Sequence, residues 1–309
     1  MKQEFEDITA NNLLEEEKIK YDTNRKFFDG LAKKVFIACA LLMVFIIFAI
    51  MLFVGQQGLQ TFLEVSPLEF FLQEEWNPFA NKYGALSFIS GSIFVTLLAI
   101  FIGAPLGVAG AIFMAKVAPK KLYDVMKPAV GLYMAIPSVV YGYIGLTIIV
   151  PFVREFFDVP SGFGLLTASL ILSVMILPTV ISVSEDAIRS VPKTLEEASL
   201  AMGATYWQTI WHIVLPAALP GIMTAVILGM ARAIGETMAV QMVIGNAPKI
   251  ARSLFTPTST LPSEIVIEMG NTPFGSAWSN SLFLMALVLL LISLSMIIFI
   301  RKMVARKVV

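Results

Sequence analysis

Residues 281–300 read SLFLMALVLLLISLSMIIFI, a run of twenty residues without a charged side chain. About 20 apolar residues in an α-helix cross the hydrocarbon core of a bilayer. A helix is favoured there because every backbone N–H and C=O group must find its partner inside the chain. The run therefore predicts a membrane-spanning helix, and residues 35–54, VFIACALLMVFIIFAIMLFV, predict another.

The composition places the whole chain among membrane proteins. Of its 309 residues, 57% are hydrophobic and only 14% are charged, which is too apolar for an ordinary soluble domain. The 22 basic and 22 acidic residues balance, so the net charge indicates neither nucleic-acid binding nor an acidic ligand. The single cysteine and single histidine exclude a disulfide scaffold and a multi-histidine metal site.

Further apolar windows lie between these two spans. They contain many glycines and alanines, which allow helices to pack closely. We therefore predict an all-α integral membrane protein with six transmembrane helices, of which the inner four form the packed core and the first and last face lipid. The inner windows are residues 84–115, 128–153, 163–183 and 215–247, and their prolines include Pro105, Pro137, Pro151, Pro178 and Pro220.

The lysines and arginines predict how the chain is oriented. Seventeen of the 22 lie before the first span, after the second, after the fourth and after the last. Four lie in the remaining connections, and Arg232 lies within a span. Because positive charge gathers on cytoplasmic loops, we predict a multi-pass protein of the cell membrane with both termini cytoplasmic. Residues 1–34 do not resemble a cleavable signal peptide, since acidic residues crowd the start and the apolar segment is too long.

These predictions divide the chain into five segments. A cytoplasmic tail, a first transmembrane helix and an extracytoplasmic loop precede a core that extends nearly to the C-terminus. The core contains a cytoplasmic segment, called the elbow, and a second extracytoplasmic loop. In chain order the segments are 1–34, 35–54, 55–83, 84–300 and a cytoplasmic tail at 301–309, with the elbow at 184–215 and the second loop at 248–280.

The elbow has the pattern of two short helices. Thr194 with Glu197, and Thr205 with Gln208, have the spacing of capping boxes, in which the hydroxyl accepts from the amide three residues on. Gly203 separates the two helices, where a left-handed backbone costs glycine little, and Pro216 is expected to end the second.

A single apolar stripe is predicted on the second elbow helix. Trp207, Ile210, Trp211 and Val214 recur at i, i+3, i+4 and i+7, which is the period of one helix face. This stripe either docks on the protein's own cytoplasmic face or inserts into a partner protein.

Two opposite charges fall inside the fifth span. Arg232 and Glu236 lie four residues apart, so on a continuous helix they share one face and can pair. A charge at the bilayer centre costs about 2.5 to 3.5 kcal/mol or more, so both must face protein or water. The pair is either a structural brace or a site where the guanidinium receives an oxyanion in two-point contacts.

The elbow sequence resembles a known family signature. Glu197-Ala198-Ser199, then Gly203, then Ile213-Val214-Leu215-Pro216 match the E-A-A, three residues, G, nine residues, I-x-L-P pattern of ABC-importer permeases, with Ser199 in place of alanine. The resemblance implies a MetI-like type I ABC-importer permease core, whose elbow is the coupling helix that contacts a cytoplasmic ATPase. The contact residues it implies are Glu196, Glu197, Ala198, Gly203, Trp207, Leu215 and Pro216.

A nucleotide-binding loop is missing from the sequence. Residues 103–110 are rich in glycine but lack the lysine and hydroxyl of the G-x-x-x-x-G-K-[ST] pattern, so they are better explained by close helix packing. We therefore expect this chain to bind no cofactor and to perform no covalent chemistry. ATP and magnesium are expected on the separate ATPase.

Two further runs resemble phosphate-importer permeases of the PstC type. They are RAIGETMAVQMVIGN at 232–246 and AIPSVVYGYIGL at 135–146. This resemblance implies a subunit that passes inorganic phosphate inward along a path containing Arg232, Glu236 and Thr237. The implied partners are a sister permease of the PstA type in a heterodimer, two ATPase subunits of the PstB type, an extracytoplasmic phosphate-binding protein and membrane lipid, with no nucleic acid.

Other functions remain as alternatives. Within the importer class the substrate is alternatively another oxyanion such as sulfate, molybdate or phosphonate. A carrier driven by an ion gradient is favoured by inverted repeats and several intramembrane carboxylates, whereas Glu236 is the one acid well inside a predicted span. An intramembrane enzyme needs a base beside a nucleophile, and Ser138 and Tyr141 have none nearby in the sequence.

Overall fold

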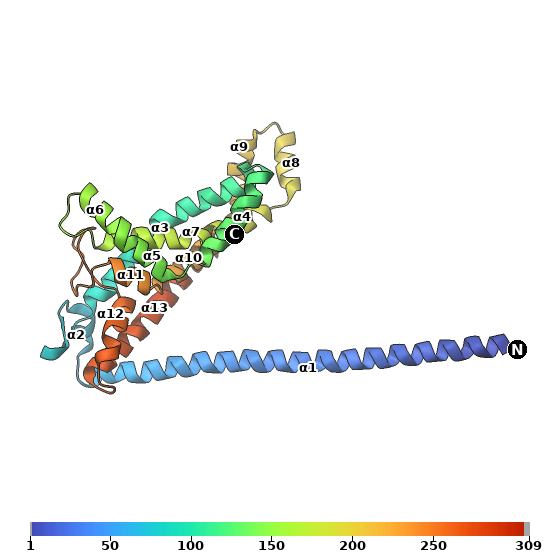
Figure 1. Cartoon of the computed structure of the whole chain (residues 1–309), viewed down its shortest axis with the longest axis horizontal. Coiled ribbons are helices and arrows are strands. Elements are labelled where there is room, and N and C mark those ends of the chain that lie inside the picture. Colours follow the sequence, from blue (N-terminus) through green and yellow to red (C-terminus); the bar gives the residue numbers. More distant parts are fainter. Residues whose placement is uncertain (1, 306–309) are drawn as a thin grey trace. The chain divides into compact units, whose positions relative to one another are not determined.

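The computed structural model describes the backbone of residues 2–305 and the side chains of residues 29–302 (Figure 1). The chain forms two units, residues 1–54 and residues 55–309. Helix α1, Lys2–Gln60, makes up the described part of the first unit and continues into the second. Residues 306–309 of the predicted C-terminal tail lie outside the described residues.

The second unit consists of helices and one small antiparallel sheet. Its strands β1 and β2 pair Trp76 with Tyr83 and Asn77 with Lys82. In chain order its elements are the 3-10 turn Thr61–Leu63, α2 Pro67–Leu72, β1 Trp76–Asn77, the 3-10 turn Pro78–Ala80, β2 Lys82–Tyr83, α3 Leu86–Ile112, the π-helical turn Phe113–Val117, α4 Lys120–Met134, α5 Ser138–Ile144, the π-helical turn Gly145–Ile149, α6 Val150–Phe156, α7 Leu165–Arg189, α8 Lys193–Ala201, α9 Tyr206–Thr209, the π-helical turn Ile210–Val214, α10 Leu215–Ile234, α11 Met238–Val243, α12 Leu261–Glu268, the 3-10 turn Met269–Asn271 and α13 Ala277–Ala305.

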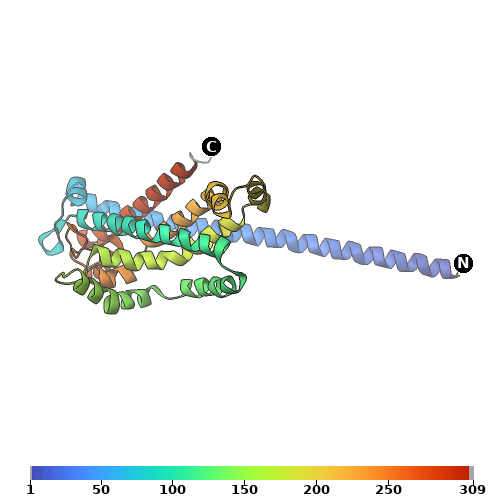
Figure 2. The ribbon, with the colours of Figure 1, turned by 90° about the horizontal axis from the view of Figure 1, so that it is seen from above.

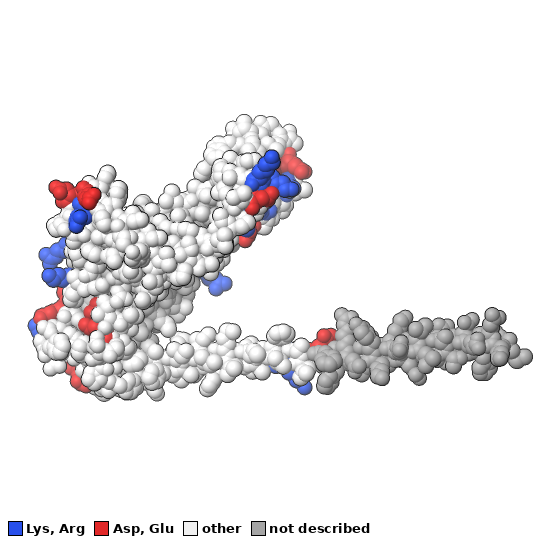
Figure 3. Space-filling model, in the orientation of Figure 1, with Lys and Arg blue, Asp and Glu red and all other residues white. Residues whose placement is uncertain are grey.

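The helices confirm the predicted number of spans. Within the described part of the chain, six helical segments are long and apolar enough to cross a membrane. On the second unit, most of the charged side chains in view lie toward its two ends, and the surface between them is largely uncharged (Figure 3). The spans are residues 29–63, 86–117, 138–156, 165–189, 206–234 and 277–302.

Small residues bring the central helices together, as predicted. A Cβ added to Gly103 on α3 would stand 2.9 Å from the side chain of Ile176 on α7. Backbones this close leave no room for a larger side chain. The main apolar cluster forms where α3, α5, α7 and α11 meet, and Leu172, Met175 and Ile176 of α7 lie in it fully buried.

The third window is not one helix, and the predicted span 128–153 is wrong. Helix α4 ends at Met134 and α5 begins at Ser138, so the spanning segment starts at Ser138. The cause is Pro137, which has no backbone N–H to donate and disfavours helical geometry at Ile136 before it. Helix α4 turns back along the bundle as a separate element (Figure 2).

The fifth window is also interrupted. Helix α10 ends at Ile234, and α11 begins at Met238 after the break at residues 235–237. At its other end, α9 continues through a π-helical turn directly into α10, so the expectation that Pro216 ends a helix is wrong. Pro216 lies in the first turn of α10, where a missing N–H is tolerated, and a π-helical turn accommodates one extra residue.

The buried Glu264 and the half-buried Glu268 anchor the opposite end of the unit from the elbow. Glu264 of α12 is only 5% exposed, and the Ser259 hydroxyl donates to its Oε2 at 2.8 Å. The Glu268 carboxylate accepts from the indole N–H groups of Trp76 at 3.0 Å and Trp278 at 2.7 Å. Burial raises the pKa of Glu264 to about 7, and the negative charge of Glu268 adds to this, while the Ser259 hydrogen bond opposes it.

The raised pKa of Glu264 predicts that this region loosens as pH rises. A carboxyl whose folded pKa lies above its ordinary value binds its proton more tightly when folded, so its contribution is complete below about pH 4.5 and is lost as pH rises through about 7. We expect amides of residues 260–268 to exchange hydrogen faster at pH 8 than at pH 6, after correction for intrinsic rates. Glu264→Gln should remove the difference and Glu74→Gln, at an exposed acid, should keep it. An unchanged difference in Glu264→Gln would contradict the assignment.

Candidate functional site

The break in the fifth span determines where Glu236 points. Gly235 ends α10, and the Glu236 Oε1 accepts a hydrogen bond of 3.1 Å from the backbone N–H of Ala239 in α11. A carboxylate in this position satisfies an amide in the first turn that has no partner within the helix. Thr237 lies in the same break and donates to the Gly235 carbonyl at 3.3 Å.

The expected pairing of Arg232 with Glu236 is therefore wrong. Among the described residues, no carboxylate oxygen lies within 4.0 Å of the half-buried Arg232 guanidinium, and its hydrogen-bond partner is the Thr179 hydroxyl of α7 at 3.4 Å. A guanidinium has five N–H donors and no acceptor. With one neutral partner, Arg232 keeps donors and a full positive charge for an incoming oxyanion.

Close helix packing fixes the distance between Arg232 and Thr179. One turn before Arg232, a Cβ on Gly229 would come within 2.9 Å of the Val180 Cγ2. Val180 follows Thr179 on α7 and is fully buried. No sequence pattern indicated Thr179, because it lies 53 residues from Arg232 along the chain.

Helices α5 and α11, each of which follows a break, lie against each other. A Cβ on Gly142 of α5 would meet the Met242 Sδ at 2.6 Å and the Ala239 Cα at 3.0 Å, both on α11. Across the break of the third span, the Tyr141 hydroxyl donates to the Tyr133 carbonyl of α4 at 2.8 Å. These contacts connect α4 and α5 with the start of α11, where the Glu236 carboxylate is bound.

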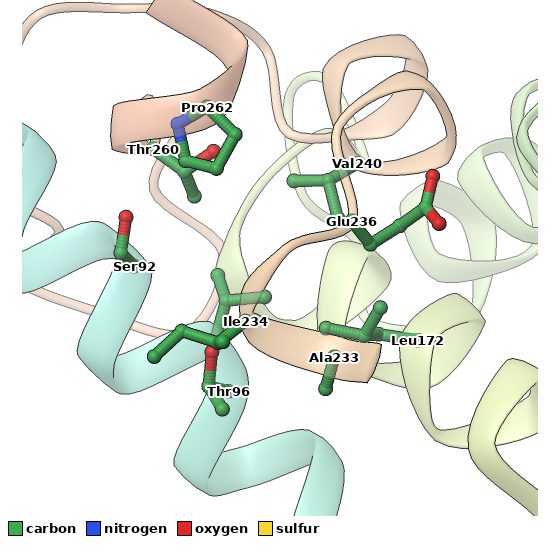
Figure 4. A pocket seen from close by; sticks show the side chains of 10 residues that line it. Ser92, Thr96, Leu172, Ala233, Ile234, Glu236, Val240, Thr260 and Pro262 are labelled. Atoms are coloured by element: carbon green, nitrogen blue, oxygen red, sulfur yellow. The ribbon is translucent and has the colours of Figure 1, made fainter. Parts of the chain in front are cut away.

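A small polar cavity lies beside the break of the fifth span. Its volume of about 10 Å³ is the space of one water molecule, so it does not admit a tetrahedral oxyanion. Ser92 and Thr96 of α3 and Thr260 line it, and the Glu236 carboxylate is turned away from them (Figure 4). In the conformation described, this cavity has room for no more than a water molecule.

The elbow contains the two predicted short helices, α8 and α9. Gly203 between them has φ +87°, and Thr205 forms a capping box with Gln208, so both predictions are confirmed. The capping box predicted at Thr194 is wrong, because α8 begins one residue earlier with Pro192 before it and no side-chain cap.

The predicted stripe of the second elbow helix divides into two faces. Ile210 and Val214 are buried, whereas Trp207 and Trp211 remain 55% and 50% exposed. The two indole rings contact edge to face at 5.8 Å and line an apolar groove of about 330 Å³ with α3. The π-helical turn explains the division, since it breaks the 3.6-residue period on which the stripe was predicted.

Polar contacts hold the elbow to the π-helical turn Phe113–Val117 that follows α3, while the outer side of the elbow stays exposed. Glu196 pairs with Lys116, and the Tyr206 hydroxyl donates to the Lys116 carbonyl at 2.7 Å. The Ser199 hydroxyl, at the position that departs from the signature, lies 2.9 Å from that of Thr209. Of the other residues predicted to contact an ATPase, Leu215 is half-buried, and those that are exposed are Glu197, Ala198, Gly203, Trp207 and Pro216.

Comparison with known proteins identifies the family. Residues 107–309 match the binding-protein-dependent transport system inner membrane component family. The chain belongs to this family of importer permeases. The permease is 48% identical over 301 residues to the probable ABC transporter permease protein YqgH of Bacillus subtilis, with 96% of this chain and 97% of the relative covered.

Two other similarities support the same family. The permease is 37% identical over 278 residues to the phosphate transport system permease protein PstC of Mesorhizobium japonicum, with 84% of each chain covered. Among solved structures it is similar to an inward-facing conformation of the MetNI methionine ABC transporter, with a TM-score of 0.54, 26% identity, and 71% of this chain and 93% of that chain covered. The predicted MetI-like permease core, with its role as a transporter subunit rather than an enzyme, is confirmed.

The contact between Arg232 and Thr179 predicts a change in uptake. Thr179→Val keeps the shape of the side chain but removes the hydroxyl, and a hydrogen bond contributes about 1 kcal/mol. If the assembled importer moves an oxyanion past Arg232, we expect the substrate concentration for half-maximal uptake to rise about fivefold. Thr179→Ser should restore the value, and Thr224→Val, whose hydroxyl bonds its own helix at Pro220, should leave it unchanged. Equal effects at Thr179 and Thr224 would contradict the role of Thr179.

Proposed function

We propose that the permease carries inorganic phosphate from an extracytoplasmic binding protein into the cytoplasm. The observation that carries this proposal is Arg232, a half-buried guanidinium at a break between membrane helices with a neutral hydroxyl as its partner. Such a group favours a doubly charged tetrahedral anion because it supplies several N–H donors and a permanent charge. Similarity to PstC of Mesorhizobium japonicum supports phosphate as that anion.

The proposed path contains Arg232, Glu236 and Thr237. In the conformation described, Glu236 is bound to the first turn of α11, so Arg232 is available to the anion. A change at the break that releases Glu236 would bring a negative charge toward Arg232. That charge would weaken anion binding and help the substrate to leave inward.

The proposed assembly supplies the energy from outside this chain. It consists of this permease with a sister permease of the PstA type, two ATPase subunits of the PstB type that hold ATP and magnesium, and the binding protein. The exposed side of the elbow, including Glu197 and the half-exposed Trp207, is proposed to contact an ATPase. We propose that both termini lie on the cytoplasmic side with the elbow, because most lysines and arginines lie in these segments.

Another oxyanion permease, for sulfate, molybdate or phosphonate, is the second candidate within this class. It is favoured by the same feature, because a guanidinium also binds these anions. The substrate presented by the binding protein separates the two candidates.

The proposed function predicts phosphate-stimulated ATP hydrolysis in lipid vesicles that hold the complete assembly. We expect phosphate with its binding protein to stimulate hydrolysis more than sulfate or molybdate with theirs. Glu197→Lys should abolish the stimulation because it reverses a charge on the exposed elbow surface, while Glu155→Lys, an exposed acid on α6, should preserve it. Stimulation by sulfate or molybdate alone would overturn the substrate, and failure of any ATPase to co-purify would overturn the importer assembly.

A further inference from the structure

Helix α4 has little packing to hold it in place. None of the residues in Lys120–Met134 is buried, and the break at residues 135–137 separates this helix from α5. A helix that buries no side chain gains little from the hydrophobic effect. Its position must therefore depend on a few specific contacts along its length.

The polar contacts that Tyr123 and Lys127 of α4 make converge on one buried acid of α7. Glu185 is fully buried, and its carboxylate accepts from Lys127 and from the Tyr123 hydroxyl of α4, the latter at 3.2 Å. Arg189, one turn along α7, also pairs with Glu185. Asp186 contacts the same lysine at 2.9 Å but is 67% exposed. We call Glu185, Lys127, Tyr123 and Arg189 the Glu185 cluster, and Asp186 lies at its exposed edge.

The charges of the Glu185 cluster favour a rigid contact between α4 and α7, which we call the joint. Two cations neutralise one carboxylate that is completely removed from solvent, and a buried charge left without partners is strongly unfavourable. Burial lowers the pKa of Lys127, but its hydrogen bonds to Glu185 and Asp186 outweigh this and the pKa is raised. Lys127 therefore stays protonated, and α4 stays tied to α7.

The π-helical turn Phe113–Val117 connects the Glu185 cluster with the elbow. Arg189 lies over the Tyr123 ring at 3.9 Å and donates to the Met114 carbonyl of this turn at 3.3 Å. Two residues further along, Lys116 pairs with Glu196 of the elbow. The turn is thus held from one side by the elbow and from the other by the Glu185 cluster.

The far end of α4 leads to the proposed path. Its Tyr133 carbonyl accepts the hydrogen bond from Tyr141 of α5, and α5 packs at Gly142 directly against α11. A continuous series of contacts therefore connects the elbow with the first turn of α11, which Glu236 caps.

We propose that α4 acts as a lever. The Glu185 cluster connects it, through the π-helical turn Phe113–Val117, to the elbow, so that movement of the elbow is passed to α5 and α11. Lys127 and Glu185 are then positioning residues for transport, although neither lies on the path. This inference rests on the proposed function, because it requires the elbow to be moved by an ATPase.

The first test measures coupling in vesicles that hold the complete assembly. Lys127→Met and Glu185→Gln should keep ATP hydrolysis but lower phosphate taken up per ATP about tenfold, since each removes a charge-assisted contact. Lys127→Arg, which keeps the charge, should retain most of the coupling. Asp186→Asn is the matched control, because its contact with the same lysine is exposed. Normal coupling in both Lys127→Met and Glu185→Gln, or equal loss in Asp186→Asn, would overturn the lever.

The second test measures movement with pairs of spin labels after Cys39→Ser removes the native cysteine. The pair at Val125 and Ser190 spans the joint, and the pair at Val125 and Val140 spans the break of the third span. On trapping the ATPase with ATP and vanadate, the first distance should stay constant and the second should change. Lys127→Met should make the first distance variable. A first distance that changes as much as the second in the otherwise unsubstituted protein would overturn the lever.

The two tests separate failure of the lever from failure of the proposed function. If phosphate never stimulates hydrolysis in the otherwise unsubstituted assembly, the proposed substrate fails, while the distances still decide the lever. If stimulation is normal but both distances stay constant through the cycle, the lever alone fails.

Discussion

A backbone amide inside hydrocarbon needs a hydrogen-bond partner, and the membrane helices of this permease depend on that constraint. Regular helix satisfies it along α3 and α7, which can then pack at Gly103 with almost no side chain between them. Where the helices are interrupted, side chains take over the same task. Glu236 caps the Ala239 amide after one break, and Tyr141 binds the Tyr133 carbonyl across the other. Ala135, Pro137 and Gly235 at the two interruptions are exposed in this chain, so these side-chain hydrogen bonds matter all the more where no water is present.

The charged side chains have different roles at different places in the helix bundle. In the Glu185 cluster two cations close on a buried carboxylate and hold α4 in place. At the break of the fifth span, Arg232 has a neutral partner, because Glu236 is bound elsewhere. The first arrangement favours rigidity, and the second leaves a charge available to a ligand. At the end of the unit away from the elbow is a third arrangement: the buried Glu264 accepts a hydrogen bond from Ser259, and the half-buried Glu268 accepts from two tryptophans.

The sequence predicted the features that depend on local or repeated patterns. Apolar length identified the six spans, and the spacing of Thr205 and Gln208 identified a helix start. Apolar length also concealed the breaks, since Pro137 and Gly235 change little in a hydropathy window but end a helix. Glu236 was misplaced for that reason. The contact of Thr179 with Arg232 and that of Glu185 with Lys127 escaped notice because the partners lie more than fifty residues apart in the chain. Such pairs become visible only when helices pack.

Central to this account is that the break after α10 places Arg232 on a water-filled path during the transport cycle. The most direct test is the reaction of Arg232→Cys, in a Cys39→Ser background, with a small cationic thiol reagent that does not cross the membrane. The measurement is made in the complete assembly, with and without ATP. The account predicts that the cysteine reacts in at least one nucleotide state and that phosphate with its binding protein slows the reaction. A cysteine that reacts in no state would show that Arg232 is a structural group sealed within the bundle.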